Sequence, residues 1–69
     1  MIFIKTKFGI FSIKDVTVEL EKEKEVKGIL IYDESDEEIC EVPYYSVSDI
    51  VKNSNIIEKI LKRYYNQVK

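Results

Sequence analysis

Histidine is missing from the sequence, and cysteine occurs once, as Cys40. A single cysteine cannot form a disulfide within the chain, and without histidine the common zinc ligand sets cannot be assembled. A catalytic thiol would lack the histidine that normally activates it, so Cys40 is predicted to be a small buried side chain. We therefore expect no metal, no cofactor and no enzymatic activity.

Long apolar runs are also missing. The longest, at residues 1–4 and 29–32, contain four residues each, whereas a helix needs about 20 to cross a bilayer. Residues 1–4 are apolar, but Lys5 follows them and no basic residue precedes them, so they do not resemble a signal peptide. Together with the scarcity of cysteine, these features predict a cytoplasmic protein that does not enter a membrane.

Residue usage is skewed in a way that reflects codons rather than folding. Alanine and tryptophan are missing, and ten lysines accompany a single arginine. This usage is typical of AT-rich DNA, which indicates a low-GC bacterium or one of its phages or mobile elements.

The 69 residues are expected to form a single domain over residues 1–69. A chain of this length buries only about 60 % of the surface that its unfolded form exposes. It therefore has little room for a deep substrate cavity beside a packed core. With two glycines and one proline, it also contains no stretch that reads as a linker.

Alternation of apolar and polar residues predicts a small antiparallel sheet of about five strands, built from hairpins. The strands are expected at residues 2–7, 10–13, 16–21, 26–32 and 39–42. Turns are expected at 8–9, 14–15, 22–25 and 33–38. Glutamate and lysine at 19–27 also suit a helix, but the charged residues at 22–25 offer it no apolar position, so we interpret them as a hairpin tip. Gly28, inside a strand, indicates a bulge or a close approach of the backbone.

Apolar residues recur at helical spacing in the last third of the chain. Five of them share one stripe: Ile50, Ile57, Leu61, Tyr64 and Val68. This stripe predicts a main amphipathic helix at 56–67, with Asn55 and Glu58 as its capping pair, and a short helix at 46–52 before it. The helix is expected to cover one face of the sheet, which gives an α+β fold.

Charge is distributed unevenly along the chain. Residues 15–42 carry eleven acids and three lysines, a net charge of −8, whereas residues 1–14 and 43–69 each carry +3. An acidic surface raises the rate of association with a basic partner. The sequence therefore predicts a protein-binding module, a small acidic accessory or inhibitor protein of the kind that phages direct at host or defence proteins. The candidate partner-binding residues are Glu19, Glu21, Glu23, Asp33, Glu34, Asp36, Glu37, Glu38 and Tyr45.

Two other functions are compatible with the sequence. A nucleic-acid-binding regulator would use the outer face of the last helix, which carries Lys59, Lys62, Arg63 and Tyr65. Residues 46–67 can also be drawn as a helix-turn-helix for this purpose. A homo-oligomeric structural subunit would instead pair through an exposed edge strand at residues 39–42.

Overall fold

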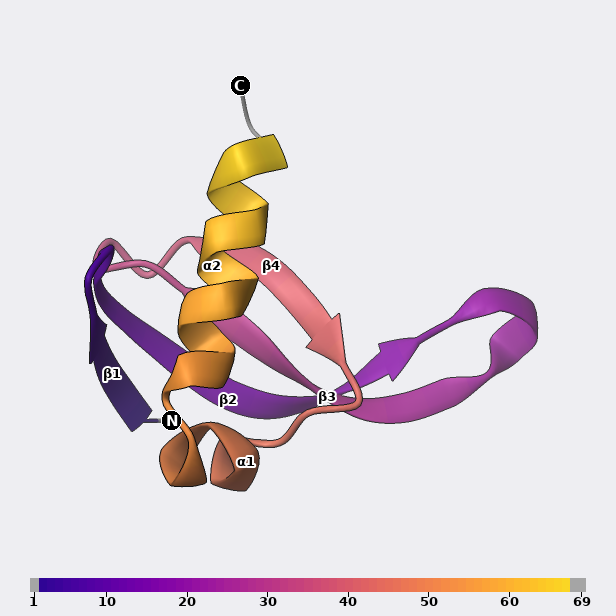
Figure 1. Cartoon of the computed structure of the whole chain (residues 1–69). Helices are drawn as coiled ribbons and strands as arrows, with labels where there is room; N and C mark the ends of the chain where they lie inside the picture. The colour runs from indigo at the N-terminus through magenta and orange to yellow at the C-terminus, as the bar shows by residue number, and fades with distance from the viewer. Residues whose placement is uncertain (1, 68–69) are drawn as a thin grey trace.

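Figure 1 shows an antiparallel sheet with a helix lying across one of its faces. The computed structural model describes residues 2–67, and side chains as far as residue 66. Within them, four strands form a meander in the order β1-β2-β3-β4: β1 (Ile2–Thr6), β2 (Gly9–Glu19), β3 (Glu25–Tyr32) and β4 (Glu38–Pro43). A short turn, η1 (Glu21–Glu23), joins β2 to β3, and two helices follow β4, namely α1 (Val47–Lys52) and α2 (Asn55–Gln67). The predicted α+β class, with an antiparallel sheet before two helices, is confirmed.

The predicted turn at residues 14–15 is wrong, which is why the sheet has four strands and not five. Lys14 and Asp15 lie inside β2, where they pair with Leu30 and Ile29 of β3. The amine of Lys14 lies 5.5 Å from the centre of the Tyr32 ring. A charged residue can continue a strand when its long side chain lies along apolar neighbours in this way.

The apolar side chains of β2 change from one face of the sheet to the other between Ile13 and Val16. Phe11 and Ile13 belong to the cluster beneath the helices, whereas Val18, although only 6 % exposed, lies outside that cluster. Side chains alternate between the two faces of an unbroken strand, so a change from odd to even apolar positions marks a change of face. We call the face of the sheet that points away from the helices the open face.

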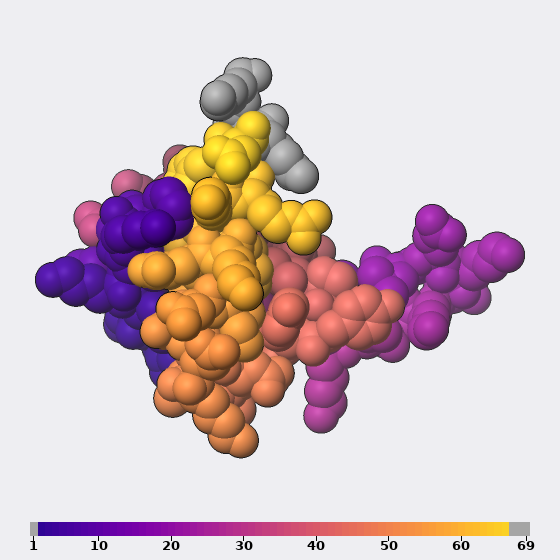
Figure 2. All heavy atoms as spheres, in the orientation of Figure 1, coloured from indigo at the N-terminus to yellow at the C-terminus, as the bar shows by residue number. Residues whose placement is uncertain are grey.

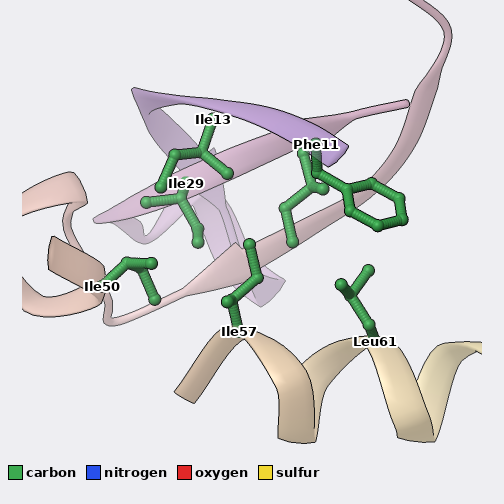
Figure 3. Close-up of a cluster of buried hydrophobic side chains, with 7 residues drawn as sticks. Phe11, Ile13, Ile29, Ile50, Ile57 and Leu61 are labelled. Carbon is green, nitrogen blue, oxygen red and sulfur yellow. The ribbon is translucent and has the colours of Figure 1, made fainter. Parts of the chain in front are cut away.

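One hydrophobic cluster joins the helices to the sheet (Figure 3). Its members from the sheet and from the helices point toward one another. Seven side chains in it are 3 % exposed or less: Phe11, Ile13, Ile29, Ile31, Ile50, Ile57 and Leu61. Fully burying one such side chain contributes about 1.5–3 kcal/mol, so this cluster dominates the stability of a chain with a small core. Val68, the last member of the predicted stripe, lies outside the described residues.

The first helix begins at a capping box that the sheet supports. Ser46 Oγ accepts a hydrogen bond from the Asp49 N–H at 3.2 Å, and the Asp49 carboxylate accepts one from the Ser46 N–H at 3.0 Å. These two bonds satisfy backbone donors that the start of a helix leaves unpaired. Asp15 of β2 accepts a further bond from the Val47 N–H at 2.9 Å, so α1 is attached to the sheet at its first residue.

The predicted cap of the main helix is wrong in detail. α2 begins at Asn55 itself, whose N–H donates to Asn53 Oδ1 at 3.1 Å. Glu58 is directed at the sheet, because its Oε2 accepts a hydrogen bond from the Lys7 N–H at 3.2 Å. This acid therefore connects α2 to the turn between β1 and β2.

Three predicted turns are confirmed, at residues 8–9, at 22–25 and at 33–38, the last of which joins β3 to β4. Gly9 has φ +122°, in the region that favours glycine, where β2 begins. The segment between β2 and β3 is a hairpin tip and not a long helix, because Leu20 N–H donates to the Lys24 carbonyl oxygen across it. Lys22 and Glu23 at this tip have φ +57° and +62°, left-handed values that cost a non-glycine residue about 1–2 kcal/mol.

Gly28 lies at a close approach of three strands, as its position in a strand predicts. A Cβ atom added to it would lie 2.5 Å from the Val42 carbonyl oxygen and 2.6 Å from Val18 Cγ2. The first of these atoms belongs to the backbone, so it cannot move without shifting β4. The irregularity in the pairing of β3 with β4 lies elsewhere, between Ile31 and Tyr32.

Gly28→Ala is expected to lower the free energy of unfolding by about 2 kcal/mol, because the added methyl group overpacks a site that backbone atoms define. Adding Val18→Ala should not restore stability, since the contact with the Val42 carbonyl oxygen persists. Denaturant unfolding of the single and double variants measures both effects. A Gly28→Ala variant as stable as the parent, or one that Val18→Ala fully rescues, would contradict this packing.

Candidate partner-binding surface

The predicted acidic residues are divided between the two ends of β3 and do not form one face. Glu19, Glu21 and Glu23 lie at the tip of the β2–β3 hairpin, an arm that projects from the body of the molecule (Figure 2). The other five lie between β3 and β4 or at the start of β4: Asp33, Glu34, Asp36, Glu37 and Glu38. β3 contains eight residues, so at about 3.3 Å per residue it separates the two groups by roughly 25 Å.

The hairpin tip carries little net charge, because lysines alternate with acids along it. Lys22 and Lys24 lie between Glu21, Glu23 and Glu25 in the sequence, and all five are exposed. The electric fields of neighbouring charges of opposite sign largely cancel one another at distances beyond the screening length, which is about 8 Å at physiological salt. The tip is therefore expected to attract a basic surface less strongly than the number of its glutamates alone would suggest.

The acidic turn, residues 33–38, carries five negative charges and no positive one. Asp33 shapes it, because its Oδ1 accepts hydrogen bonds from the Ser35 N–H at 2.8 Å and from the Glu37 N–H at 3.0 Å. Asp36 has φ +61°, a conformation that aspartate adopts more readily than most residues. Asp36, Glu37 and Glu38 are exposed, so the acidic turn presents a concentrated negative charge to solvent.

A shallow hollow of about 190 Å³ lies beside the acidic turn. Its apolar lining includes Phe8, Ile10 and Tyr65, and its polar lining comes from residues 33–35 of the acidic turn. Sites for small molecules usually measure about 300–1,000 Å³. The hollow is thus of a size to receive one side chain of a partner rather than a whole ligand.

Contacts between distant segments hold this hollow in shape. The Phe8 and Tyr65 rings stack with their centroids 5.5 Å apart and their planes at 30°. Glu34 Oε1 accepts a hydrogen bond from the Ile10 N–H at 3.4 Å, which connects the acidic turn to β2. The amine of Lys7 lies 5.8 Å from the centre of the Phe8 ring. Aromatic rings beside carboxylates attract lysine and arginine side chains, so the hollow has the chemistry to receive one.

Sequence patterns did not identify the apolar residues of the hollow. The sequence predicts only that Phe8 lies in a turn and Ile10 in a strand. It gives Tyr65 a role in the nucleic-acid alternative and not in binding a protein. Ile10 is 43 % exposed and Tyr65 41 % exposed. The one available signal was the position of Phe8 and Ile10 on either side of Gly9, where large apolar residues are unusual in a surface turn.

The tyrosine pair after β4 lies at the far end of that strand from the acidic turn. Tyr44 is 67 % exposed and Tyr45, the predicted contact residue, is 36 % exposed. Tyr44 has φ +76°, an uncommon value for an aromatic residue, and its N–H donates to the Lys27 carbonyl oxygen at 2.7 Å. Tyr45 is therefore separated from the acidic turn by the length of β4, Glu38–Pro43.

Two residues of the nucleic-acid alternative, Arg63 and Tyr65, lie against different parts of the molecule. Lys59, Lys62 and Arg63 are exposed. Arg63 lines a second hollow, of about 260 Å³, against β4, whereas Tyr65 stacks on Phe8 beside the acidic turn. A nucleic-acid strand that stacked a base on Tyr65 would bring its phosphates close to the negative charge of that turn.

Cys40 is half-buried on β4, in the same hollow as Val42 and Ile60. Burial raises the pKa of its thiol above the ordinary value. Because the thiolate is the nucleophilic form of cysteine, a raised pKa makes this side chain less reactive. The environment is that of an apolar packing residue.

Comparisons with protein-family models, with curated proteins and with solved structures give no match. No helix in the described part of the chain is long and apolar enough to cross a membrane. Within residues 2–66, no three histidine, cysteine, aspartate or glutamate side chains are grouped so that they could hold a metal ion. The surfaces described above are therefore the basis for a functional proposal.

Cys40 is expected to react with a disulfide reagent such as DTNB about tenfold more slowly in the folded chain than in the urea-unfolded chain at about pH 8, near the ordinary cysteine pKa. A raised pKa leaves less thiolate at any pH below it, so the rate in the folded chain should still rise with pH after the rate in the unfolded chain has levelled. Stopped-flow absorbance measures both rates. Equal rates, or profiles that level at the same pH, would show that burial does not control this thiol.

Proposed function

We propose that this protein is a non-enzymatic protein-binding module that docks a basic partner surface through its acidic turn. The observation that carries the proposal is the hollow beside that turn, where Phe8, Ile10 and Tyr65 meet Asp33 and Glu34. Interfaces commonly combine an apolar or aromatic centre with a charged rim. Here the apolar residues come from the two ends of the chain and the acids come from its middle, and defined contacts hold them together.

The two parts of the surface have different roles in binding. The five charges of the acidic turn attract a basic partner at a distance and orient it, an effect that weakens as salt increases. The stacked Phe8 and Tyr65 rings offer apolar area and a negative ring face to one lysine or arginine of the partner. The expected interface is thus a basic segment with one side chain anchored in the hollow.

The proposal narrows the set of predicted contact residues. Asp33 is used to shape the acidic turn, and Glu34 connects it to β2, so these two act mainly by positioning. Asp36, Glu37 and Glu38 present the charge to the partner. The hairpin tip and Tyr45 are not part of this surface. A small accessory or inhibitor protein, encoded by a phage or mobile element and acting in the cytoplasm, fits the size and residue usage of the chain.

The two alternative functions have less support. For the nucleic-acid alternative, Arg63 lines the hollow against β4, whereas Tyr65 lies beside the acidic turn, whose negative charge would repel phosphates. For a subunit that pairs through β4, the decisive residue is Pro43. Tyr44 N–H donates to Lys27 of β3, and hydrogen-bonding directions alternate along a strand, so the backbone nitrogen of Pro43 points outward. Proline has no N–H to donate, which weakens this edge as a template for another strand.

Reversing charge in the acidic turn should weaken binding of a basic peptide, whereas the same change at the hairpin tip should not. The test variant combines Asp36→Asn, which tolerates the left-handed backbone, with Glu37→Lys. The matched control combines Glu23→Asn, at a similar φ, with Glu21→Lys, so each variant changes the net charge by the same amount. A hexapeptide of alternating arginine and leucine serves as the probe.

Amide shifts in a nitrogen-15 NMR titration report the site and the affinity together. We expect shifts at residues 8–11 and 33–38, an affinity about tenfold lower in the acidic-turn variant, and an unchanged affinity in the tip variant. Tyr65→Ala should weaken binding with the charge intact. The proposal fails if the tip residues shift most, if both charge variants weaken equally, or if the peptide does not bind at low salt.

A further inference from the structure

The outer edge of β1 carries backbone groups that have no partner strand. β1 and β4 are the two edges of the sheet in the described residues. Ile10 N–H donates to Glu34, which follows β3, so Ile10 does not use this group to bond Lys5, its partner in β1. Hydrogen-bonding directions alternate along an antiparallel strand. Lys5 and, two residues before it, Phe3 therefore direct their N–H and C=O groups outward.

Of the two edges, only β1 offers these groups without a proline. The one proline of the chain is Pro43, at the end of β4. Phe3 is 73 % exposed, and it lies on the open face because it is paired with Ser12. Ile2 and Ile4 are only partly buried against the hydrophobic cluster on the helix side. A strand added beside β1 would thus cover both unpaired backbone groups and apolar side chains.

We propose that β1 of a second copy of this chain pairs antiparallel with β1 across this edge. The two-fold axis is perpendicular to the sheet and passes between the two copies of Ile4. Phe3 of each copy then lies opposite Lys5 of the other, and Ile2 lies opposite Thr6, so all five residues of β1 are paired. Phe3 and Lys5 are the residues whose backbone groups point outward, so each such pair exchanges both of its hydrogen bonds.

The side chains of β1 are the reason to choose a second copy as the occupant. Side chains that lie directly opposite on one face of an antiparallel pair contact each other. Lys5 of one copy therefore meets the Phe3 ring of the other on the open face, where a cation and a ring attract. Ile4 meets Ile4 on the helix side and extends the buried cluster.

The register follows from charge. A lysine on an edge strand usually opposes pairing with another strand. A register centred on Lys5 would place two lysines directly opposite each other, which is destabilising. In the register centred on Ile4, each Lys5 is opposite a ring and no like charge is directly opposite another.

This dimer goes beyond the proposed function and uses a different surface. The hollow beside the acidic turn is lined by residues 8–11, by residues 33–35 and by Tyr65, and by no residue of β1. Two copies joined through β1 would therefore each keep that hollow available to a basic partner. Binding of the basic peptide to a monomeric β1 variant separates the failure of one proposal from the failure of the other.

Sedimentation equilibrium of the full chain over a wide concentration range tests the dimer. We expect a reversible dimer in the parent. Phe3→Lys places like charges opposite each other in both Phe3–Lys5 pairs, whereas Phe3→Glu places a carboxylate opposite each Lys5. Both variants remove the same ring, so the sign of the new charge is what distinguishes them. Phe3→Glu should dimerise about tenfold more tightly than Phe3→Lys, or better.

The matched control is Val51→Lys on α1, because Val51 is also an exposed apolar residue, at 62 %. It adds the same charge away from β1 and should leave dimerisation at the parent level. Lys5→Pro tests the backbone contact, since it removes an N–H that points outward and makes no bond to β2. This variant should be a folded monomer by circular dichroism and should still bind the basic peptide.

Amide hydrogen exchange of the parent gives an independent measurement if Lys5→Pro does not fold. The amides of Phe3 and Lys5 should exchange more slowly at concentrations where the dimer forms than at concentrations where it dissociates. A parent chain that is monomeric at every concentration overturns the proposal. So do equal dimerisation of Phe3→Lys and Phe3→Glu, a folded Lys5→Pro dimer, or a dimer in which these two amides gain no protection.

Discussion

The packing of α2 onto the sheet is the interaction on which the rest of the structure depends. Ile57 and Leu61 are fully buried against the strands, and in the described residues they belong to the hydrophobic cluster that joins the helices to the sheet. The same packing fixes the direction of α2. As a result Glu58 reaches the β1–β2 turn and Tyr65 reaches Phe8. The hollow proposed to receive a partner is therefore a consequence of how the core is built.

Much of the fold follows from local patterns, and its exceptions have long-range causes. Helical spacing located both helices to within about one residue, and Gly9 marked its turn, because these signals depend on residues near in sequence. The number of strands was wrong because Lys14 and Asp15 look like a turn locally. Their stabilising partners, Tyr32 and the backbone of Val47, lie 18 and 32 residues further along the chain, where no local pattern reveals them.

The candidate surface could be predicted only in part, for a similar reason. The acids themselves are visible in the sequence, but their division into two groups depends on the direction and length of β3. The hollow needs Phe8, Glu34 and Tyr65 together, and nothing in their spacing indicates that they meet. The apolar residues of β2 change from odd to even positions, which resembles a break between two strands. The sequence pattern therefore did not indicate that one strand contributes apolar residues to both faces of the sheet.

The proposed binding surface depends on α2 packing against one particular face of the sheet. The packing of α2 on that face is therefore the claim to test first. Methyl-resolved NOE spectra of the folded chain do so directly. The account predicts cross-peaks from the methyl groups of Ile57 and Leu61 to side chains such as Ile29 of the buried cluster, and none from these methyl groups to Val18 or Leu30. Cross-peaks between α2 and Val18 or Leu30 would place the helix on the other face and contradict it.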